Sequence, residues 1–587
     1  MTTLYRRIQI GSYVILVFVL VLGLRLLQLQ VIEADKYKRL SEQNRLRILR
    51  VPAARGIIFD RNGVALVKNI PYFSVSIMPE SRQTVDTAAL AELLGMSRGD
   101  VEERLNRKNL SPFVPIKLRL GLTPREVARI EARRADFPGL SIDTDMGREY
   151  IFGKAGSQVV GYLGKITNAQ LMNPHLRNFP PDTMIGQWGI EAMYDEQLRG
   201  TAGEKIIEID ALGRELRLIH EQKPMRGKDI TLSIDIEVHR AMEGAFGEKA
   251  GAVVALDPRS GEVLALESIP TFDPNVFARG ITAAEWKALV ENKKNPMLNR
   301  ALQSQYPPGS TFKIITAVAA LERGVITPDM RVYCKGGISS GPWTFGCWQK
   351  GGHGSVNLHR AIVESCDVYF YEVGRRLGID AISQYALAFG LGKETGLAIH
   401  PVKERRGLIP TAEWKKDNKG LPWYLGDTFM SAIGQGFITT TPLQTALMMS
   451  TFANGGTLIA PTLIKGESGR RETLGLRPDT LALVKKGLAG VVNEGNGTAK
   501  GARSAMTVIG GKTGTAQVIG KRKGAVAERF MDHAWFVAFA PVEEPEIAVA
   551  IFVEHGGSGG KAAAPLARRA IDAYMMSKKK DEKAAVQ

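Results

Sequence analysis

The sequence predicts an α/β domain over residues 236–575, preceded by an α+β segment over residues 36–235 and by one N-terminal membrane-spanning helix. Three observations lead to this prediction. Apolar runs with the character of buried strands occur near both ends of the long C-terminal region. Segments rich in Ala, Leu and Ile, typical of helices, lie between those runs. One uncharged N-terminal run is long enough to cross a lipid bilayer.

The composition is that of an ordinary globular protein. The chain has 587 residues, which at about 150 residues per domain allows two to four domains. Hydrophobic residues make up 44% and charged residues 23%, so wholesale disorder and a polytopic membrane protein are both disfavoured. Lys and Arg (77) outnumber Asp and Glu (60), which gives a net charge of +17. This basic excess suits a nucleic acid, a membrane surface or an acidic polymer.

The N-terminal run over residues 8–24 carries no charge and follows Arg6 and Arg7. It is not followed by a small-residue cleavage site, which favours a retained anchor over a cleaved signal peptide or a buried core helix. The positive-inside rule places Arg6 and Arg7 in the cytoplasm and the rest of the chain outside it. We therefore expect residues 1–35 to be a cytoplasmic stub and anchor in the inner membrane, with a periplasmic body that meets no nucleic acid.

The segment after the anchor has a mixed pattern. Residues 33–56 are polar with a helical character, and up to about residue 235 short strand-like pieces such as Tyr72–Met78 alternate with helical pieces such as Thr123–Arg134. No catalytic motif occurs there, so we interpret residues 36–235 as a scaffold or docking module.

The C-terminal region begins with two apolar runs around the turn residues 257–261, a pattern that predicts a β-hairpin. Residues 533–541 and 546–556 have the composition of buried strands, and the apolar spacing from residue 562 onward predicts a final helix. Residues 576–587 form a charged tail that we expect to be disordered.

A candidate nucleophile lies at the start of one predicted helix. Ser310 and Lys313 form an S-x-x-K motif, and residues three apart share a helix face, so the amine of Lys313 can reach the hydroxyl of Ser310. A desolvated lysine with a lowered pKa can take the proton that makes a serine hydroxyl reactive. The motif alone is weak, because Ser577 and Lys580 in the tail match it by chance.

Two further motifs accompany Ser310. Residues 365–367 read Ser-Cys-Asp, and residues 512–515 read Lys-Thr-Gly-Thr within a strand-like run. These three elements in this order are the signature of penicillin-binding proteins and serine β-lactamases. Three coincident matches in one domain are the alternative.

The wider sequence resembles a class B penicillin-binding protein, and among its subtypes most resembles the elongation-specific penicillin-binding protein 2. The resemblance rests on RGIIFDRNG, GIEAMYDEQLRGTAG, YPPGSTFK, GQGFITTTPLQ, GKTGTAQ and DHAWFVAFAP, which cover the chain from the anchor to the final helix. It implies a transpeptidase domain of the penicillin-binding protein and serine β-lactamase type, an antiparallel sheet with a helical subdomain. Residues 36–235 would be the non-catalytic pedestal, or dimerisation-type domain, with a head subdomain.

The resemblance also implies an activity, that of a serine-type peptidoglycan D,D-transpeptidase. It would act on D-Ala-D-Ala stem peptides and be inhibited by β-lactams. Ser310 would attack the substrate carbonyl with Lys313 as general base, and Ser365 would relay a proton with the help of Lys512. Backbone N–H groups of Ser310 and Thr515 would form the oxyanion hole. The substrate carboxylate would lie along Lys512, Thr513, Gly514 and Thr515.

The second motif departs from the family pattern, because it ends in Asp367 where the family usually has Asn. A side-chain amide can donate a hydrogen bond to the substrate and a carboxylate cannot. A direct bond from Asp367 to the substrate is therefore in doubt, and Asp367 can instead accept a bond from Lys313 or Lys512.

The three cysteines fall in one window with a histidine: Cys334, Cys347, His353 and Cys366. Three thiolates and one imidazole suit a closed tetrahedral zinc site, and relatives of the elongation type are known to bind zinc in this region. Such a structural Zn²⁺ would fix the second motif without joining the chemistry. The alternatives are a disulfide between Cys334 and Cys347 with Cys366 free, or three unlinked thiols, and His359 is an alternative ligand.

No glycan-polymerising domain is recognisable before residue 250. The family implies that a RodA-type glycosyltransferase and an MreC-type scaffold are partners. A β-lactamase, a D,D-carboxypeptidase, a penicillin sensor and a scaffold that has lost activity are the competing interpretations, and a septal transpeptidase is the competing subtype. The anchor and the long pedestal argue against a β-lactamase, and the presence of every motif lysine and serine argues against a scaffold that has lost activity. The choice of elongation over septal division rests on the resemblance alone.

Overall fold

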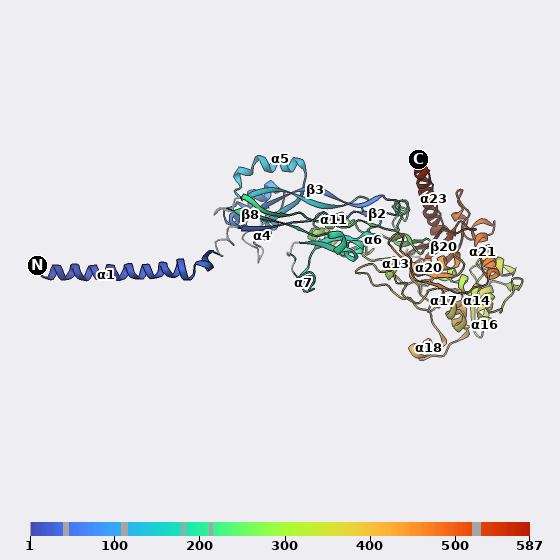
Figure 1. Cartoon of the computed structure of the whole chain (residues 1–587). Coiled ribbons are helices and arrows are strands. Elements are labelled where there is room, and N and C mark those ends of the chain that lie inside the picture. The colour runs from blue at the N-terminus through green and yellow to red at the C-terminus, as the bar shows by residue number, and fades with distance from the viewer. Residues whose placement is uncertain are drawn as a thin grey trace. The chain divides into compact units, whose positions relative to one another are not determined.

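The computed structural model describes residues 2–38, 46–106, 115–177, 179, 183–209, 215–518 and 530–586 (Figure 1). The chain divides into two compact units. The first consists of residues 1–56 and 196–228, and the second consists of residues 57–195 and 229–587.

The first unit carries the N-terminal helix and a small sheet. Helix α1 spans Thr2–Leu27 and continues into the π-helical turn η1, Gln28–Ile32. From Leu4 to Leu27 its side chains are exposed, and within the described residues it is the only helix long and apolar enough to cross a membrane. The sheet has the order β1-β8-β9, with β1 at Leu46–Val51, β8 at Gly203–Ile209 and β9 at Glu215–Gln222.

The helix expected over residues 33–56 is wrong for most of its length. Residues 34–38 are helical, but Leu46–Val51 form strand β1, paired antiparallel with β8 so that Leu46 lies opposite Glu208. Residues 39–45 lie outside the described part. The pairing partner is more than 150 residues away in sequence, so tertiary contact overrides local helix propensity here.

The second unit begins with the sheet of the pedestal. Its order is β10-β2-β3-β4, and β5 pairs with the long strand β3. The strands are β2 (Ile58–Phe59), β3 (Ala65–Ile77), β4 (Ile116–Leu122), β5 (Leu140–Tyr150) and β10 (Ile230–Thr231). Helices α3 (Thr87–Leu94), α4 (Arg98–Leu105) and α5 (Pro124–Ala132) share one apolar core with β3, β4 and β5. The strand predicted at Tyr72–Met78 and the helix predicted at Thr123–Arg134 are confirmed.

Several short elements complete residues 57–199. They are η2 (Pro79–Gln83), η3 (Arg134–Asp136), α6 (Ser157–Val160), β6 (Tyr162–Lys165), α7 (Asn168–Leu171), β7 (Met184–Trp188), α8 (Gly189–Met193) and α9 (Asp195–Arg199).

A five-stranded antiparallel sheet organises the C-terminal region, in the order β12-β11-β21-β20-β19. The strands are β11 (Gly251–Leu256), β12 (Val263–Ile269), β19 (Gly510–Ala516), β20 (His533–Ala540) and β21 (Ile547–Val553). Every residue of β11 and β21 is buried, and α20 (Pro442–Ala453) packs on both strands. The predicted hairpin and the two predicted C-terminal strands are confirmed, and so is the sheet built from both ends of the region.

Helices and small hairpins fill the sequence between β12 and β19 (Figure 1). The helical elements of this stretch are α11 (Pro274–Ala278), α12 (Ala283–Val290), α13 (Arg300–Gln303), η4 (Gly309–Phe312), α14 (Lys313–Glu322), α15 (Leu358–Val363), α16 (Asp367–Leu377), α17 (Ile379–Ala388), α18 (Ala412–Lys419), α19 (Leu425–Ala432), α21 (Pro478–Asn493) and η5 (Lys500–Ala502). Two short helices lie outside it in sequence: α10 (Ile236–Met242) precedes β11, and α22 (Gly559–Ala562) follows β21. The hairpin strands are β13 (Val332–Cys334), β14 (Gly337–Ser340), β15 (Trp343–Gly346), β16 (Gly354–Val356), β17 (Thr457–Ile459) and β18 (Arg471–Thr473).

The disorder expected for residues 576–587 is wrong, because helix α23 runs from Ala564 to Val586. Lys, Glu and Ala are good helix formers, so the charged sequence can continue the helix. Tertiary contacts also hold the first residues of the charged stretch. Ser577 accepts a hydrogen bond from Asn62, and Lys578 forms an ion pair with Glu546 at 2.8 Å.

Candidate active site

Ser310 lies in the turn η4, immediately before helix α14. The turn touches strand β19 closely: a Cβ atom on Gly309 would lie 2.7 Å from the carbonyl oxygen of Thr515 and 3.0 Å from its nitrogen. Gly309 also has a φ of +56°, which favours glycine. The sequence Pro-Pro-Gly-Ser therefore brings Ser310, which is half-buried, against the strand of the third motif.

Lys313 begins α14 and is 1% exposed. Its Nζ donates to Asp367 Oδ1 at 2.7 Å, to the Ser365 carbonyl oxygen at 2.9 Å and to Ser365 Oγ at 3.2 Å. The hydroxyl of Ser310 has no hydrogen-bond partner among the described residues. The amine thus joins the first motif to the second, and the direct bond from Lys313 to Ser310 that the helical spacing allows is not formed.

The second motif sits at the start of helix α16. Cys366 is the N-cap of that helix, and Ser365 before it has a φ of +57°, a strained value for a residue with a side chain. Asp367 accepts a hydrogen bond from the Lys313 amine on Oδ1. Its Oδ2 accepts one from the backbone N–H of Trp348 at 2.9 Å. Asp367 therefore accepts from Lys313, one of the two partners considered from the sequence, and both its oxygens are engaged.

Lys512 lies on β19 and is completely buried. Its Nζ donates to Ser365 Oγ at 2.8 Å and to the carbonyl oxygen of Thr513 at 3.2 Å. Burial, together with the charge of Lys313, lowers the pKa of Lys512 well below its usual value. The hydroxyl of Ser365 thus lies between two lysine amines.

The rest of the third motif forms one edge of the site. Strand β19 is the end strand of the sheet in the described part of the chain. Thr515 is half-buried, and its carbonyl oxygen accepts a hydrogen bond from Gln435 at 2.8 Å. The hydroxyls of Thr513 and Thr498 lie 3.0 Å apart. A Cβ on Gly514 would be 2.6 Å from the carbonyl oxygen of Pro308, so this position requires glycine.

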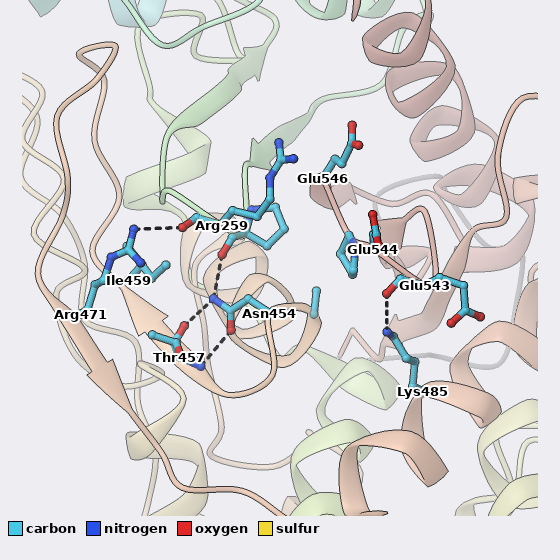
Figure 2. Close-up of a pocket in the computed structure, with 12 residues that line it drawn as sticks. Arg259, Asn454, Thr457, Ile459, Arg471, Lys485, Glu543, Glu544 and Glu546 are labelled. Carbon is cyan, nitrogen blue, oxygen red and sulfur yellow. Dashed lines mark hydrogen bonds between the residues drawn. The ribbon is translucent and has the colours of Figure 1, made fainter. Parts of the chain in front are cut away.

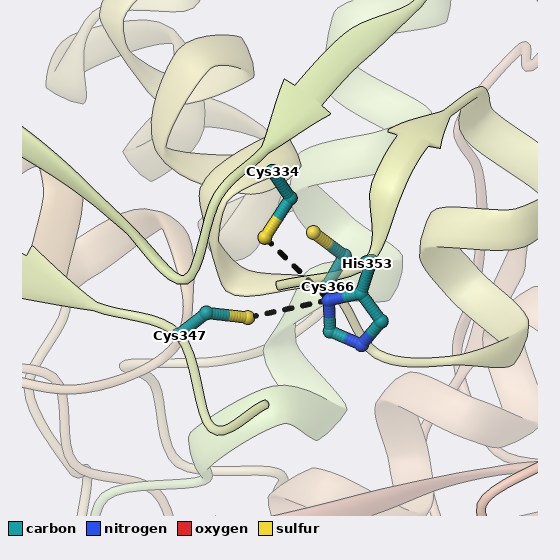
Figure 3. Close-up of side chains that lie close together, drawn as sticks. All are labelled: Cys334, Cys347, His353 and Cys366. Atoms are coloured by element: carbon teal, nitrogen blue, oxygen red, sulfur yellow. Dashed lines mark hydrogen bonds between the residues drawn. The ribbon is translucent and has the colours of Figure 1, made fainter. Parts of the chain in front are cut away.

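Cys334, Cys347, His353 and Cys366 come together next to the second motif (Figure 3). Their ligand atoms all lie within 4.8 Å of one another. The Nδ1 atom of His353 is 3.6 Å from Cys334 Sγ and 3.5 Å from Cys347 Sγ. Ligands at the usual Zn–S and Zn–N lengths of a tetrahedral site are about 3.6 Å apart. The four side chains therefore fit a zinc ion in number, type and spacing.

The other two arrangements considered for these residues are not found. All three cysteines are free and buried, so Cys334 and Cys347 are not joined by a disulfide. His359 bonds Glu494 at 2.8 Å and is not part of the group. The hydrogen bond between Cys366 and Cys347 lowers the pKa of Cys347 to about 5 and raises the pKa of Cys366, so the pair shares one proton between two thiols.

A pocket elsewhere in the same region contains none of the motif residues (Figure 2). Its volume is about 470 Å³. Arg259 and Arg471 line one part of it, and Glu543, Glu544 and Glu546 line another. Lys485 lies among the acidic residues and donates to the carbonyl oxygen of Glu543 at 3.1 Å.

Comparison with protein families decides which family has this arrangement. The penicillin binding protein transpeptidase domain matches residues 251–572, and the penicillin-binding protein dimerisation domain matches residues 50–232. The chain belongs to the penicillin-binding protein family. The transpeptidase-domain match contains the three motifs and the four-residue Cys/His group.

Two curated relatives of this penicillin-binding protein align over nearly its full length. The peptidoglycan D,D-transpeptidase MrdA of Acinetobacter baumannii is 35% identical over 98% of this chain and 89% of the relative. The protein of the same name from Escherichia coli K12 is 35% identical over 97% of this chain and 94% of the relative.

Solved structures of penicillin-binding proteins are similar as well. The complex of PBP2 with MreC from Helicobacter pylori has a TM-score of 0.79 at 28% identity, covering 90% of this chain and 99% of the other. PBP2 of Pseudomonas aeruginosa with WCK 5153 has a TM-score of 0.67 at 33% identity, covering 90% and 96%. A peptidoglycan synthase complex that coordinates polymerisation and crosslinking gives 0.73 at 33% identity, covering 97% and 98%.

Two residues of the site in this penicillin-binding protein were missed by the sequence analysis. Trp348 donates its indole N–H to the carbonyl oxygens of Glu364 and Ser365, both at 3.1 Å, besides its backbone bond to Asp367. Gln435 holds the carbonyl of Thr515. Trp348 directly follows Cys347 and Gln435 lies within the quoted GQGFITTTPLQ run, but neither position signals these contacts.

Proposed function

We propose that this chain crosslinks peptidoglycan during cell-wall elongation as a D,D-transpeptidase, through a serine acyl-enzyme on Ser310. The observation that carries the proposal is the position of the Ser365 hydroxyl. It lies 3.2 Å from the amine of Lys313 and 2.8 Å from that of Lys512, beside the turn that presents Ser310. These hydrogen bonds support a role for the two buried amines and the Ser365 hydroxyl in activating Ser310, whose own hydroxyl has no hydrogen-bond partner among the described residues.

In the acylation step, Ser310 Oγ attacks the carbonyl carbon between the two terminal D-alanines. Once Lys313 has passed a proton through Ser365 to Lys512, its neutral amine takes the hydroxyl proton of Ser310, and the C–N bond breaks as the last D-Ala leaves. The leaving amine needs a proton, and the chain Lys313–Ser365–Lys512 can deliver one through hydrogen bonds that are already formed. The lowered pKa of Lys512 favours its neutral form before substrate binds.

Strand β19 and turn η4 would bind and stabilise the reacting peptide. An extended substrate can pair with the outer edge of β19, and its terminal carboxylate can lie along Thr513, Gly514, Thr515 and the ammonium of Lys512. That negative charge would favour protonation of Lys512 once the substrate is bound. The close contact between Gly309 and Thr515 supports an oxyanion hole made from the N–H groups of Ser310 and Thr515, worth about 3 kcal/mol per donor.

In the second step, an amine from a neighbouring stem attacks the ester carbonyl of the acyl-enzyme. The new amide bond forms, Ser310 Oγ leaves, and the amine proton returns to the serine through the same lysine. Water in place of the amine would give a carboxypeptidase reaction, and the two outcomes differ only in the acceptor.

We also propose that Cys334, Cys347, His353 and Cys366 hold a zinc ion. A zinc ion there supplies no chemistry to the reaction and acts as a cross-link between chain segments. Cys366 lies between Ser365 and Asp367, so fixing its thiolate fixes both neighbours. The strained φ of Ser365 supports this role, because such a conformation persists only where its surroundings hold it.

Helix α1 supports a single-pass anchor in the cytoplasmic membrane, with Arg6 and Arg7 inside and the catalytic region in the periplasm. The similar PBP2 that forms a complex with MreC, and the similar peptidoglycan synthase complex, support an MreC-type scaffold and a RodA-type glycosyltransferase as partners. β-Lactams are expected to acylate the same serine as the stem peptide.

The proposal is tested by covalent labelling with a fluorescent penicillin. We expect Ser310→Ala to abolish labelling and Ser577→Ala, at the other S-x-x-K match, to leave it unchanged. Labelling that survives Ser310→Ala contradicts the assignment of the nucleophile. Purified enzyme given polymerised lipid-linked precursor should yield crosslinked dimers by mass spectrometry, whereas trimmed tetrapeptides alone would indicate a carboxypeptidase.

A further inference from the structure

Residues 331–355, which we call the metal-site lobe, have an unusual surface. Three aromatic side chains of the lobe are largely exposed: Tyr333 at 73%, Trp343 at 72% and Trp348 at 57%. Arg331, Lys335 and Lys350 are exposed as well, and the lobe contains no Asp or Glu. Within the described residues none of these three cations has a hydrogen bond or an ion pair. The lobe thus offers aromatic rings and uncompensated positive charge to solvent.

Two of the exposed rings lie beside anchored residues. Tyr333 precedes Cys334 on β13, so the alternation of a strand turns the tyrosine outward when the cysteine points into the ligand group. Trp348 follows Cys347 and is held by its bonds to Ser365 and Asp367. Trp343 stands at the start of β15.

The hairpin of β14 and β15 is itself fixed to the helices beneath it. Phe345 packs on Phe429 with ring centroids 5.1 Å apart, and a Cβ on Gly426 would be 2.8 Å from its ring. The hydroxyl of Tyr371 donates to the Gly346 carbonyl at 3.1 Å. A preorganised aromatic surface binds a ligand with little loss of side-chain entropy.

We propose that the metal-site lobe is a docking surface for the glycan strand and its acidic stem peptides. The proposal rests on the proposed function and extends the site from the D-Ala-D-Ala terminus to the polymer that carries it. The C–H face of a sugar ring is apolar and stacks on exposed Trp and Tyr rings, and stem-peptide carboxylates complement the three cations. Trp348 makes the surface continuous with the second motif, so a strand on the lobe leads its stem toward Ser310.

The test uses the full chain in lipid nanodiscs and compares two ligands. One is uncrosslinked glycan strands bearing pentapeptide stems, and the other is the free pentapeptide. We expect the double variant Tyr333→Ala/Trp343→Ala to bind the strands about tenfold more weakly. Binding of the free pentapeptide and the rate of acylation by fluorescent penicillin should not change, because neither residue touches the catalytic groups. Lys335→Glu/Lys350→Glu should weaken strand binding and reduce its dependence on salt.

The matched control is Trp286→Ala, which removes a tryptophan that is 46% exposed on helix α12, outside the lobe. It should bind strands like the parent. Equal affinity of the parent and the lobe variants for glycan strands overturns the inference about the lobe. If the same proteins are still acylated by penicillin at the normal rate, the proposed function is unaffected by that result. Loss of acylation in the parent itself contradicts the proposed function instead.

A membrane is the other class of surface that basic and aromatic side chains can bind. Nanodiscs made with brominated phospholipids distinguish it, because bromine quenches tryptophan at the bilayer. Stronger quenching of the parent than of Trp343→Ala would place the ring at lipid and overturn the glycan assignment. Equal quenching of the two proteins supports it.

Discussion

Lys512 has an amine whose protonation depends on its surroundings. In an unfolded chain the pKa of a lysine is near 10.4, and in the folded protein burial and the charge of Lys313 lower it well below that value. Between the two pKa values the unfolded state binds more protons than the folded state. The free energy of unfolding therefore rises with pH across this window.

Replacing Lys512 with Met should remove that dependence. We expect the unfolding free energy of the parent to increase with pH, between the lowered pKa of the folded state and the ordinary lysine value, more steeply than that of Lys512→Met, because the variant has no buried amine to deprotonate. Acylation by penicillin should fall by about 100-fold or more, because Ser365 loses one of its two amines. Urea unfolding at a series of pH values measures the first effect and labelling kinetics the second.

The control for this experiment is Lys485→Met, whose amine bonds the carbonyl oxygen of Glu543, away from the three motifs. It should keep both the pH dependence and the acylation rate of the parent. Parallel stability curves for the parent and Lys512→Met would show that the amine is not the source of the slope.

At the scale of elements, the site depends on the contact between turn η4 and strand β19. These segments are about 200 residues apart in sequence, and Gly309 allows their backbones to approach within the space a side chain would need. The contact positions the N–H groups of Ser310 and Thr515 relative to each other. A small displacement of the turn should therefore affect the chemistry more than the stability.

Gly309→Ala tests this contact. The added Cβ would lie 2.7 Å from the Thr515 carbonyl oxygen and take a φ of +56°, so the turn must move away from β19. We expect acylation to slow by about 100-fold, as for a misplacement of about 1 Å. The unfolding free energy should fall by about 1–3 kcal/mol. Labelling kinetics and urea unfolding on the same preparation measure both.

Gly324→Ala is the matched control at the other end of α14. Gly324 has a φ of +65° but nothing lies within 4 Å of the position of an added Cβ. This variant should lose stability through backbone strain and keep its acylation rate. Equal acylation rates in the two alanine variants would refute a role for the η4–β19 contact.

Part of this site could be predicted from local sequence. The S-x-x-K spacing places Lys313 after Ser310 on one helical turn, and strand-like flanks place Lys512 on β19. Which of the two lysines bonds Asp367 could not be predicted, because the second motif lies more than 50 residues away from Lys313 and its approach is set by packing. The hydrogen bond from the Trp348 backbone to Asp367 could not be predicted for the same reason. The pairing of β1 with β8 could not be predicted either, because a distant partner overrides local helix propensity.

At the scale of the whole molecule, the catalytic motifs come from three distant stretches of chain that the sheet and helices bring together. The Cys/His group connects one further segment, the metal-site lobe, to the second motif. The lobe contributes Cys334, Cys347 and His353, and the start of α16 contributes Cys366. A metal bound there would add a cross-link between segments that the hydrogen bonds of Trp348 to Asp367 and of Tyr371 to Gly346 also join. Its free energy of binding is therefore added to the folding free energy of the second motif.

Metal analysis of the purified full chain tests this coupling. We expect about one equivalent of zinc in the parent, and a loss of zinc, of melting temperature and of acylation rate in His353→Ala, because Ser365 and Asp367 are no longer fixed through Cys366. His359→Ala should keep its zinc and its activity, since His359 bonds Glu494 outside the group. A parent with less than about a tenth of an equivalent of zinc would contradict the metal site. Equal acylation rates in parent and His353→Ala would leave the ion without influence on the second motif.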